Sequence, residues 1–347
     1  MAAHASQIFA DPIDTPSIQD QSPSQQPLIG ITKAQTHIVA VGSRGVIITG
    51  SLLGTNWKQA NVPVQSDLTD VFFLNDKIGW AVGHDGVILK TVDGGHKWIK
   101  LADGITLRGE FEAYYNNKIK LSSTQPDSNI NAQSAGLAAD LTEIKENFDP
   151  GPILPWLGAW FVNAKTGYVV GPFGDIARTN DGGKSWIPWL DHIDNPNFYD
   201  LNAIQSISGN LFIVGEQGGV YLYDPKQDKF INRSTSYTGP LFGLCGNAQT
   251  ILVFGLRGHI YRSTDLGKNW VESANPSSST IMSGTELPDG DFILVTVNGN
   301  ILRSTDAGVT FKVLPKVMDS ALSDVIYSHG KLIMTSLGGI RITTIEN

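Results

Sequence analysis

Short apolar runs of strand length alternate with polar, glycine-containing turns along most of the chain. In one stretch, apolar runs at 68–74, 79–82 and 87–91 precede a segment around Trp98. The glycines after Val82 supply the backbone freedom of a tight hairpin. No unit contains a ten-residue stretch with helical periodicity, so helical and βαβ folds are disfavoured. The pattern predicts antiparallel units of four short strands.

A G-x-x-G-x-[IV] segment repeats at 41–47, 82–88, 170–176, 214–220 and 254–260, and Thr replaces its first glycine at 296–299 and 335–338. The second glycines stand at 45, 86, 174, 218, 258, 299 and 338, so successive copies are 39–44 residues apart except for one interval of 88. A period of about forty residues with four strands indicates a β-propeller. The sequence therefore predicts an all-β chain, a seven-bladed β-propeller of four-stranded antiparallel blades.

The first strands of these units begin at Leu28, Leu68, Leu157, Leu201, Leu241, Ile281 and Leu322. In each unit the residue two positions later has a small or short side chain, as expected where inner strands crowd around an axis. These residues are Gly30, Asp70, Ala159, Ala203, Gly243, Ser283 and Asp324. The resulting divisions are blades one and two at 28–102 and blades three to seven at 153–347, in one propeller domain. The last unit lacks its own fourth strand, and we expect residues 1–27 to close it, with Ser6–Ala10 as that strand.

The long interval contains an insertion at 103–152. Phe111, Tyr114, Tyr115 and Ile119 follow helical spacing within it, as do Leu137, Leu141, Ile144 and Phe148. These two patterns predict a helical hairpin between blades two and three, placed over the G-x-x-G face. Aromatic side chains beside a rigid scaffold are candidate binding hot spots, so Phe111, Tyr114 and Tyr115 are candidate partner-binding residues. The alternative is that this stripe is fully used in packing onto the blades.

Composition narrows the function classes. Hydrophobic residues make up 41% of the chain and charged residues 17%. The 25 basic and 33 acidic residues give a net charge of −8, and this negative charge disfavours a nucleic-acid partner. No apolar run is long enough to span a bilayer. The single Cys245 excludes an internal disulfide and a thiolate metal cluster, and His192, His259 and His329 lack metal-ligand spacing, so we expect no metal and no cofactor.

A second repeated segment is T-V-D-G-G-H-K-W at 91–98, with copies at 179–186, 263–270 and 304–311. It is similar to the Asp-box of bacterial-neuraminidase-repeat (BNR) propellers. In that turn the carboxylate accepts backbone N–H groups and the aromatic ring packs into the blade, so the box is a structural device. Its residues here are Asp93, Gly95, Trp98, Asp181, Gly183, Trp186, Asp265, Gly267, Trp270, Asp306 and Gly308.

The combined pattern G-x-x-G-x-I-x-R-[ST]-x-D-x-G-x-x-W resembles the photosystem II assembly/stability factor-like family over residues 28–345. The resemblance implies an exported, non-enzymatic propeller of the non-photosynthetic branch. Such a protein would be a periplasmic scaffold or assembly factor that binds a membrane protein complex, such as a component of an RND-type transporter. Ala3-His4-Ala5 has the form of a signal-peptidase site, which also favours export; the alternative is a chance match in a cytosolic chain.

Two sets of residues are candidates for partner binding. The first occupies the G-x-x-G tips and comprises Arg44, His84, Asp85, Phe173, Glu216 and Arg257. The second is a basic column on the third strands, formed by Lys90, Arg178, Arg262 and Arg303, with Thr49, Leu222 and Ile342 in the other blades. The alternatives are ordinary solvated turns for the first set and cations paired within the fold for the second.

A rival hypothesis is a sialidase-like, glycan-binding or glycan-hydrolysing propeller. That chemistry needs an arginine cluster and an acid converging on the axis. The chain has eight Arg residues, three of them in the basic column, and Asp70 with Asp324 is its best acid pair. His84 beside Asp85 suggests a general base, but adjacent tip residues usually point apart and no nucleophile accompanies them. Catalysis is therefore the less favoured interpretation.

Overall fold

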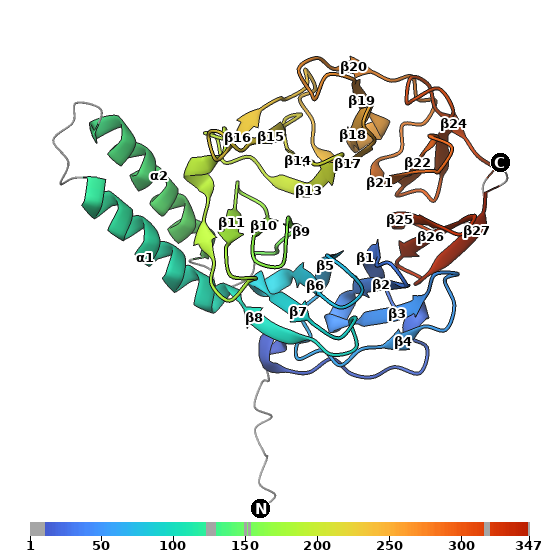
Figure 1. The fold of residues 1–347 in the computed structure, drawn as a ribbon, viewed down its shortest axis with the longest axis horizontal. Helices are drawn as coiled ribbons and strands as arrows, with labels where there is room; N and C mark the ends of the chain where they lie inside the picture. The colour runs from blue at the N-terminus through green and yellow to red at the C-terminus, as the bar shows by residue number, and fades with distance from the viewer. Residues whose placement is uncertain (1–10, 123–129, 149–150, 152–153, 316–319, 346–347) are drawn as a thin grey trace, which may run out of the picture.

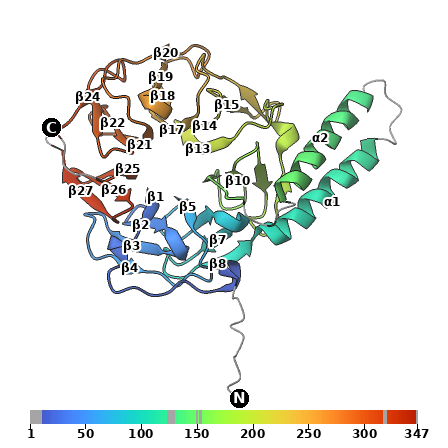
Figure 2. The same cartoon turned by 180° about the vertical axis from the view of Figure 1, so that it is seen from behind.

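The computed structural model describes residues 11–122, 130–148, 151, 154–315 and 320–345. Seven antiparallel sheets surround a central axis, and two helices project from one side of the ring (Figures 1 and 2). This confirms the seven-bladed propeller with a helical insertion between blades two and three. The described residues include no helix long and apolar enough to cross a membrane.

The strands follow chain order from the axis outward in every blade. Blades one to three consist of β1 (Leu28–Lys33), β2 (His37–Gly42), β3 (Ile47–Ser51) and β4 (Lys58–Gln59); β5 (Leu68–Phe73), β6 (Gly79–Gly83), β7 (Ile88–Thr91) and β8 (Ile99–Ala102); and β9 (Gly158–Phe161), β10 (Gly167–Val170), β11 (Ile176–Thr179) and β12 (Ile187–Pro188). Blades four and five consist of β13 (Leu201–Ile207), β14 (Asn210–Gly215), β15 (Val220–Asp224) and β16 (Lys229–Asn232); and β17 (Leu241–Gly246), β18 (Ile251–Gly255), β19 (Ile260–Ser263) and β20 (Val271–Glu272). Blades six and seven consist of β21 (Ile281–Glu286), β22 (Phe292–Thr296), β23 (Ile301–Ser304) and β24 (Lys312–Val313); and β25 (Leu322–Ser328), β26 (Lys331–Ser336) and β27 (Arg341–Thr344).

The expected column of short inner-strand residues is confirmed in six blades and is wrong by one residue in the third. In the six blades a bulge separates the first residue of the strand from the column position, as between Leu28 and Gly30. Blade three pairs without that bulge, so Gly158 lies opposite Val170 at the column position. Ala159 is the next residue along.

The seventh repeat is also shifted by one residue from the expected alignment. Ser336, and not Thr335, lies opposite Leu322, at the place that Gly42 holds opposite Leu28. The left-handed turn residue is accordingly Gly339, with φ +90°. Ile342 lies opposite Ile333, as Arg303 lies opposite Ile293, so it holds the third-strand position of the basic column in this blade, as expected.

The G-x-x-G glycines are required by close backbone approach. A Cβ on Gly83 would lie 2.1 Å from the carbonyl oxygen of Asp67, in the link that enters the blade. Gly45 has φ +68°, and a Cβ there would lie 2.0 Å from the carbonyl oxygen of Val64. Each blade-to-blade link thus packs directly against a glycine-containing tip, and this fixes the tips on one face of the ring.

The Asp-boxes form as expected at all four positions. In blade two the Thr91 hydroxyl accepts the Gly95 N–H at 3.0 Å and donates to Asp93 at 2.8 Å. The indole of Trp98 donates to the Gly95 carbonyl at 3.0 Å, and its ring is buried. The box therefore ties the third strand to the outer strand, and its hydroxyl, carboxylate and indole groups are occupied by hydrogen bonds within the turn.

Replacing Asp306 by asparagine is expected to lower the free energy of unfolding at neutral pH by at most about 1 kcal/mol, because the carboxylate is largely exposed. Burial raises its pKa, but hydrogen bonds from Thr310 and Ser304 outweigh that and lower the pKa to about 2 from 3.8. The stabilisation is complete above pH 4 and is lost as pH falls through about 2. Thermal melts of wild type and Asp306→Asn from pH 7 to 2.5 should therefore converge at the acidic end. Melting temperatures of the two proteins that differ by the same amount across that range would contradict a lowered pKa for Asp306.

Residues 11–27 run along the outside of the ring past blade one. Pro12 accepts the Gln65 N–H at 2.7 Å near blade two, Gln19 contacts the Ala60 carbonyl of blade one, and Ser24 accepts the Ile340 N–H of blade seven at 2.8 Å. Asp11, the first described residue, thus lies on the far side of blade one from blade seven. Ser6–Ala10, expected to complete blade seven, falls outside the described residues.

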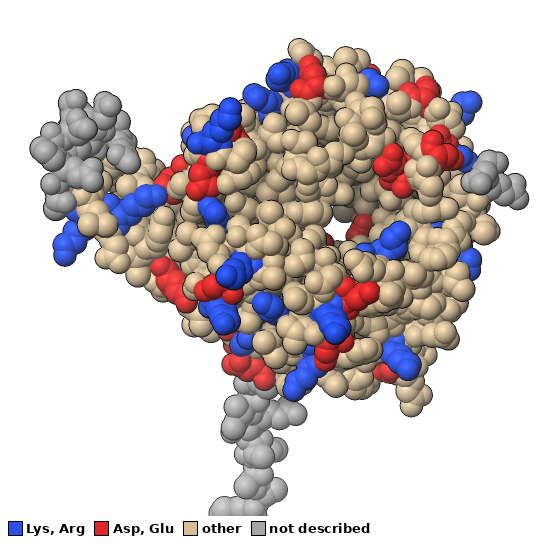
Figure 3. Space-filling model, viewed as in Figure 1, with Lys and Arg blue, Asp and Glu red and all other residues tan. Residues whose placement is uncertain are grey.

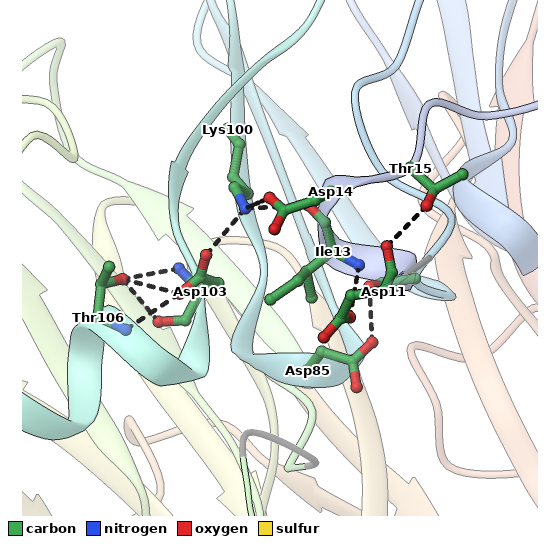
Figure 4. A network of polar contacts seen from close by, with 9 residues as sticks. Asp11, Ile13, Asp14, Thr15, Asp85, Lys100, Asp103 and Thr106 are labelled. Atoms are coloured by element: carbon green, nitrogen blue, oxygen red, sulfur yellow. Dashed lines mark hydrogen bonds and ion pairs between the residues drawn. The ribbon is translucent and has the colours of Figure 1, made fainter. Parts of the chain in front are cut away.

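The insertion forms two antiparallel helices, α1 (Gly104–Ser122) and α2 (Ile130–Phe148). Asp103 begins α1 with reciprocal hydrogen bonds to Thr106, a capping box, and its carboxylate also pairs with Lys100 of β8 at 2.9 Å (Figure 4). Lys100 reaches Asp14 at 2.8 Å as well, so one ammonium joins the N-terminal segment, blade two and the hairpin.

The direction of the hairpin differs from the expectation. It projects radially from the rim beside blade three and does not cover the ring of tips (Figures 1 and 2). Its base lies beside the tip of blade two, because a Cβ on Gly86 would meet Gly104 at 2.6 Å. Its apolar stripe joins the core of blades two to four.

Candidate binding face

The G-x-x-G tips present a mixed set of side chains on the face that receives the links between blades. Arg44, His84, Phe173 and Arg257 are exposed, and Asp85 and Glu216 are half-buried. The exposed residues Arg44, Phe173 and Arg257 hold left-handed backbone, with φ of 54–57°. Hydrogen bonds to the adjacent link fix that geometry, as where the Asp67 carboxylate accepts the Arg44 N–H at 2.7 Å. The tips are therefore held rigidly by the fold.

His84 and Asp85 do not form a catalytic pair. The Asp85 carboxylate accepts the Ser66 hydroxyl at 2.6 Å, which ties the tip to the preceding link. Among the described residues no hydrogen bond joins the His84 ring to Asp85. The geometry thus offers no orienting group for a histidine base at this tip.

A channel of about 600 Å³ runs along the axis, lined by inner-strand residues of all seven blades. Its opening is visible in Figure 3, where acidic and basic side chains are interspersed over the same face. Thr32, Asn202, Gln205 and Thr285 give the channel polar groups beside apolar ones. It can admit water or a slender polar group.

The two channel carboxylates join neighbouring blades. Asp70 of blade two accepts the Ala159 N–H of blade three at 2.8 Å, and Asp324 of blade seven accepts the Ile31 N–H of blade one at 2.9 Å. Burial raises the pKa of both, to about 6 for Asp324. Each carboxylate also accepts the N–H of the following residue in its own strand. Because their oxygens are occupied by backbone donors, Asp70 and Asp324 act as structural links between inner strands.

The four cations of the basic column each have a partner within the fold. Lys90 donates to the Gly182 carbonyl of blade three at 2.9 Å, and Arg262 donates to the Ala307 carbonyl of blade six at 2.6 Å. Arg178 binds both oxygens of Asp228, and Arg303 pairs with Asp291 at 2.6 Å. Their role in partner binding stays a prediction.

Alanine at Arg178 is expected to lower the free energy of unfolding by about 2 kcal/mol, because the guanidinium is both paired and stacked. It lies 4.7 Å from the Trp189 ring, and its side chain is 17% exposed. Arg262→Ala, which removes one exposed hydrogen bond, should cost less than about 1 kcal/mol. Denaturant titration of both variants measures the difference. Equal losses of unfolding free energy in the two variants would show that the loss depends on the position in the column and not on the partner of each cation.

Two of the three aromatic residues expected to contact a partner are buried. Phe111 is 1% exposed and packs edge-on against Phe148 at 6.1 Å, while Tyr115 is fully buried. Tyr114 is half-buried, beside Tyr115 and under the Lys118 ammonium. The stripe is thus used in packing the hairpin onto itself and blade three, and Tyr114 alone of the three is partly accessible.

A polar cluster that the sequence did not reveal docks the hairpin. Lys118 of α1 forms an ion pair with Asp191 in the turn η5 (Leu190–His192) of blade three. Burial, then the nearby Asp191 charge, raises the pKa of Asp140 in α2 to about 7. Asn147 of α2 donates to the buried carboxylate of Asp175 at 3.1 Å. These partners are distant in sequence and carry no repeat pattern, so no local signal pointed to them.

The structure offers no metal or thiol chemistry within the described residues. They contain no group of three or more His, Cys, Asp or Glu side chains that could hold a metal ion. Cys245 is buried in β17, and burial raises the pKa of its thiol well above the usual range. It is a small core side chain and not a reactive thiol.

Comparison with known proteins places the chain in one family. The model of the family described as Photosynthesis system II assembly factor YCF48 matches residues 50–125 and 156–313. The chain is 26% identical over 264 residues to Photosystem II assembly protein Ycf48 of Thermosynechococcus vestitus, covering 74% of each protein. It is 29% identical over 180 residues to the protein of the same name from a Synechococcus strain, where the match spans about half of each chain, 49% and 50%.

Solved structures support the same fold. The chain superposes on YCF48 bound to D1 peptide with a TM-score of 0.64 at 16% identity, covering 96% of this chain and 100% of that one. YCF48 from Cyanidioschyzon merolae gives 0.64 at 15% identity, with coverage of 93% and 96%. Virginiamycin B lyase from Staphylococcus aureus gives 0.66 at 12% identity, with coverage of 95% and 99%, so likeness at this level shows the fold alone. The family model matches well over half of the residues of this chain, and the chain therefore belongs to the family of the photosystem II assembly factor YCF48.

Proposed function

We propose that the chain is a non-enzymatic, periplasmic assembly or accessory factor that holds an extended segment of a membrane protein complex. The observation that carries this is the family match over residues 50–125 and 156–313. A solved relative is described as bound to a D1 peptide, which supports recognition of a peptide segment by this type of propeller. An RND-type transporter component is the proposed partner for this chain.

The rigid G-x-x-G face suits that role. Phe173 is 48% exposed on a tip whose backbone is fixed by Asp200, and Leu337 of blade seven is 67% exposed. Arg44 and Arg257 add exposed charge to the same face. Apolar anchors on a rigid scaffold, surrounded by polar groups, are typical of protein recognition.

The sialidase-like alternative has little support from the site. The channel carboxylates Asp70 and Asp324 are occupied by backbone N–H donors of neighbouring blades. Arg178 and Arg303, which a sialidase would need for a substrate carboxylate, are already paired with Asp228 and Asp291. We therefore expect no turnover of a fluorogenic sialoside, and measurable turnover that Asp324→Asn abolished would favour the enzyme.

Affinity purification from the native envelope, followed by mass spectrometry, tests the proposal. The wild-type chain should enrich an integral membrane protein. A Phe173→Ser/Leu337→Ser double variant should lose it while keeping its melting temperature, because both side chains are exposed. A Val92→Ser/Val309→Ser variant, with two exposed side chains in the Asp-boxes, is the matched control. Equal enrichment by all three chains would contradict a binding role for the tips.

A chain whose residues 104–152 are replaced by a short Gly/Ser linker tests the hairpin separately. The replaced helices bury Phe111, Tyr115 and Ile144, so the linker chain is expected to melt at a lower temperature. If it still folds cooperatively and loses the partner, the hairpin contributes to recognition. Unchanged enrichment would assign the hairpin to packing alone.

A further inference from the structure

Each inner strand runs from the G-x-x-G face toward the Asp-boxes. In blade two, Leu68 pairs with Gly83 of the tip at the start of the strand. Beyond the end of the strand, the Lys77 carbonyl accepts the Gly94 N–H of the Asp-box at 3.0 Å. The axial channel therefore has one end among the tips and the other end among the Asp-boxes.

The channel end near the Asp-boxes is lined by residues that stand two positions beyond Asp70 and its equivalents. Alternate residues of a strand lie on the same side, so these positions form one level of the channel. Six of them line it, whereas the seventh, Cys245, is buried. The six lining residues, which we name the Asp-box ring, are Thr32, Phe72, Trp160, Gln205, Thr285 and Ile326.

One side of the Asp-box ring is aromatic. Phe72 of blade two and Trp160 of blade three have ring centroids 4.6 Å apart, with their planes inclined at 55°. Both side chains are half-buried in the channel wall. This wall can therefore pack against a flat apolar surface of a bound molecule.

Most of the other members of the Asp-box ring are polar, and none is charged. Gln205 of blade four lies next to Trp160 around the axis, and Thr285 and Thr32 belong to blades six and one. Within the described part of the chain, no hydrogen bond uses the Gln205 amide or the Thr32 hydroxyl, and their polar atoms are not buried. These groups are free to bind a molecule in the channel.

The indole of Trp160 differs from the other seven indoles, all of which lie in described segments. Four of those donate to backbone carbonyls: Trp57, Trp80, Trp98 and Trp270. Three are buried without a partner: Trp156, Trp186 and Trp189. Trp160 alone of the eight combines an unbonded indole N–H with a place in the wall of a cavity. It adds a hydrogen-bond donor beside the aromatic wall.

We propose that the Asp-box ring binds the pyranose ring of an uncharged saccharide. A pyranose has a flat face of C–H groups, which fits the wall formed by Phe72 and Trp160. The hydroxyls around its edge match the Gln205 amide, the threonine hydroxyls and the indole N–H. The channel volume of about 600 Å³ lies within the range of small-molecule sites. This site lies at the opposite end of the channel from the tips, so the inference goes beyond the proposed function.

The charges of the channel disfavour ionic ligands. Among the described residues that line it there is no Lys, Arg or His, and the next level inward holds Asp70 and Asp324. Burial raises the pKa of Asp324 only to about 6, so this carboxylate repels an anionic sugar at neutral pH. A cation is disfavoured because every oxygen of the two carboxyls already accepts a backbone N–H.

The polar members of the Asp-box ring disfavour a purely apolar ligand. Such a molecule would displace water from the Gln205 amide and the Thr32 hydroxyl and leave both groups without a partner. An uncharged saccharide avoids this cost as well as the cost of charge repulsion.

Saturation-transfer NMR and calorimetric titration of the full-length chain test the site. The uncharged probes are maltose, lactose and N,N′-diacetylchitobiose, and the charged probes are N-acetylneuraminic acid and spermidine. At least one uncharged probe should bind, and both charged probes should bind at least about tenfold more weakly than the best of them. No binding by any uncharged probe, or tighter binding of a charged probe, overturns the proposal.

Variants locate the binding within the channel. Gln205→Leu keeps the size of the side chain and removes no hydrogen bond of the described fold, so it should melt as wild type and bind at least about tenfold more weakly. Trp160→Ala should weaken binding by at least as much. Met282→Ala, which changes the same channel at its G-x-x-G end, is the matched control and should bind as wild type.

Equal binding by Gln205→Leu and wild type, or a larger loss in Met282→Ala than in Gln205→Leu, also overturns the proposal. These titrations use the purified chain without a membrane partner. Their outcome is therefore independent of the envelope enrichment that tests the proposed function.

Discussion

Replacing Trp80 by alanine is expected to lower the free energy of unfolding by about 3–5 kcal/mol, the range for removing a large buried aromatic side chain. Trp80 is fully buried in β6, and its ring stacks on Phe161 of blade three with centroids 3.6 Å apart. Its indole donates to the Gly182 carbonyl at 3.2 Å. The variant therefore loses apolar contact and a hydrogen bond at the junction of two blades.

Trp80→Phe is the matched variant for this prediction. It keeps an aromatic ring against Phe161 and removes the indole N–H, so its loss should be about 1–2 kcal/mol. Denaturant titration followed by circular dichroism measures both. A Trp80→Ala chain that unfolds within 1 kcal/mol of wild type would show that the junction repacks freely, contrary to the close stacking observed.

Replacing Asp175 by asparagine is expected to stabilise the protein at high pH, by about 5 kcal/mol at pH 9 relative to the difference at pH 4. The Asp175 side chain is 2% exposed, and burial raises its pKa to about 8 from 3.8. The folded state therefore keeps a proton that the unfolded state has released above pH 4. Wild-type stability from this group is complete below pH 4 and falls as pH rises to about 8. The neutral amide of Asp175→Asn escapes that loss.

Melting temperatures from pH 4 to 9 measure this prediction. Asp140 lies in the same interface with a pKa raised to about 7, so Asp140→Asn should show the same trend with a smaller total change that levels off nearer pH 7. Asp14→Asn, at a carboxylate whose side chain is 72% exposed, is the control and should run parallel to wild type. Parallel curves for Asp175→Asn would show that the carboxyl is ionised in the folded protein throughout.

The propeller was predictable because its signals repeat. Gly83 and its equivalents recur in five of the seven tips, where a Cβ on that glycine would lie too close to a backbone oxygen of the adjacent link. The Asp-box recurs between the third and outer strands of four blades. Because each signal recurs in several blades, an unclear copy can be placed by its spacing from the others. The number of blades and the order of their strands could therefore be predicted from the spacing alone. The one-residue errors, at Ala159 and in the seventh tip, arose where a bulge is missing or a glycine is replaced.

The candidate site was less predictable because its contacts are not periodic. Helical spacing found the hairpin, but the sequence did not say that Phe111 and Tyr115 would be buried while Tyr114 would be partly exposed. That outcome depends on which face meets η5, through Lys118 and Asp191. The cations of the basic column were identified by position, whereas their partners lie on neighbouring blades or turns. Such pairings depend on the assembled ring and leave no local pattern.

The central claim is that the chain binds a segment of a membrane protein through its G-x-x-G face. A photo-crosslinking amino acid placed at Phe173 in living cells tests it most directly, with the same group at Val92 in an Asp-box as the control. Peptide mapping of the products should give a crosslink from position 173 to one segment of an integral membrane protein, and none from position 92. Crosslinks of equal yield from both positions, or products from position 173 that contain no membrane protein, would contradict the account.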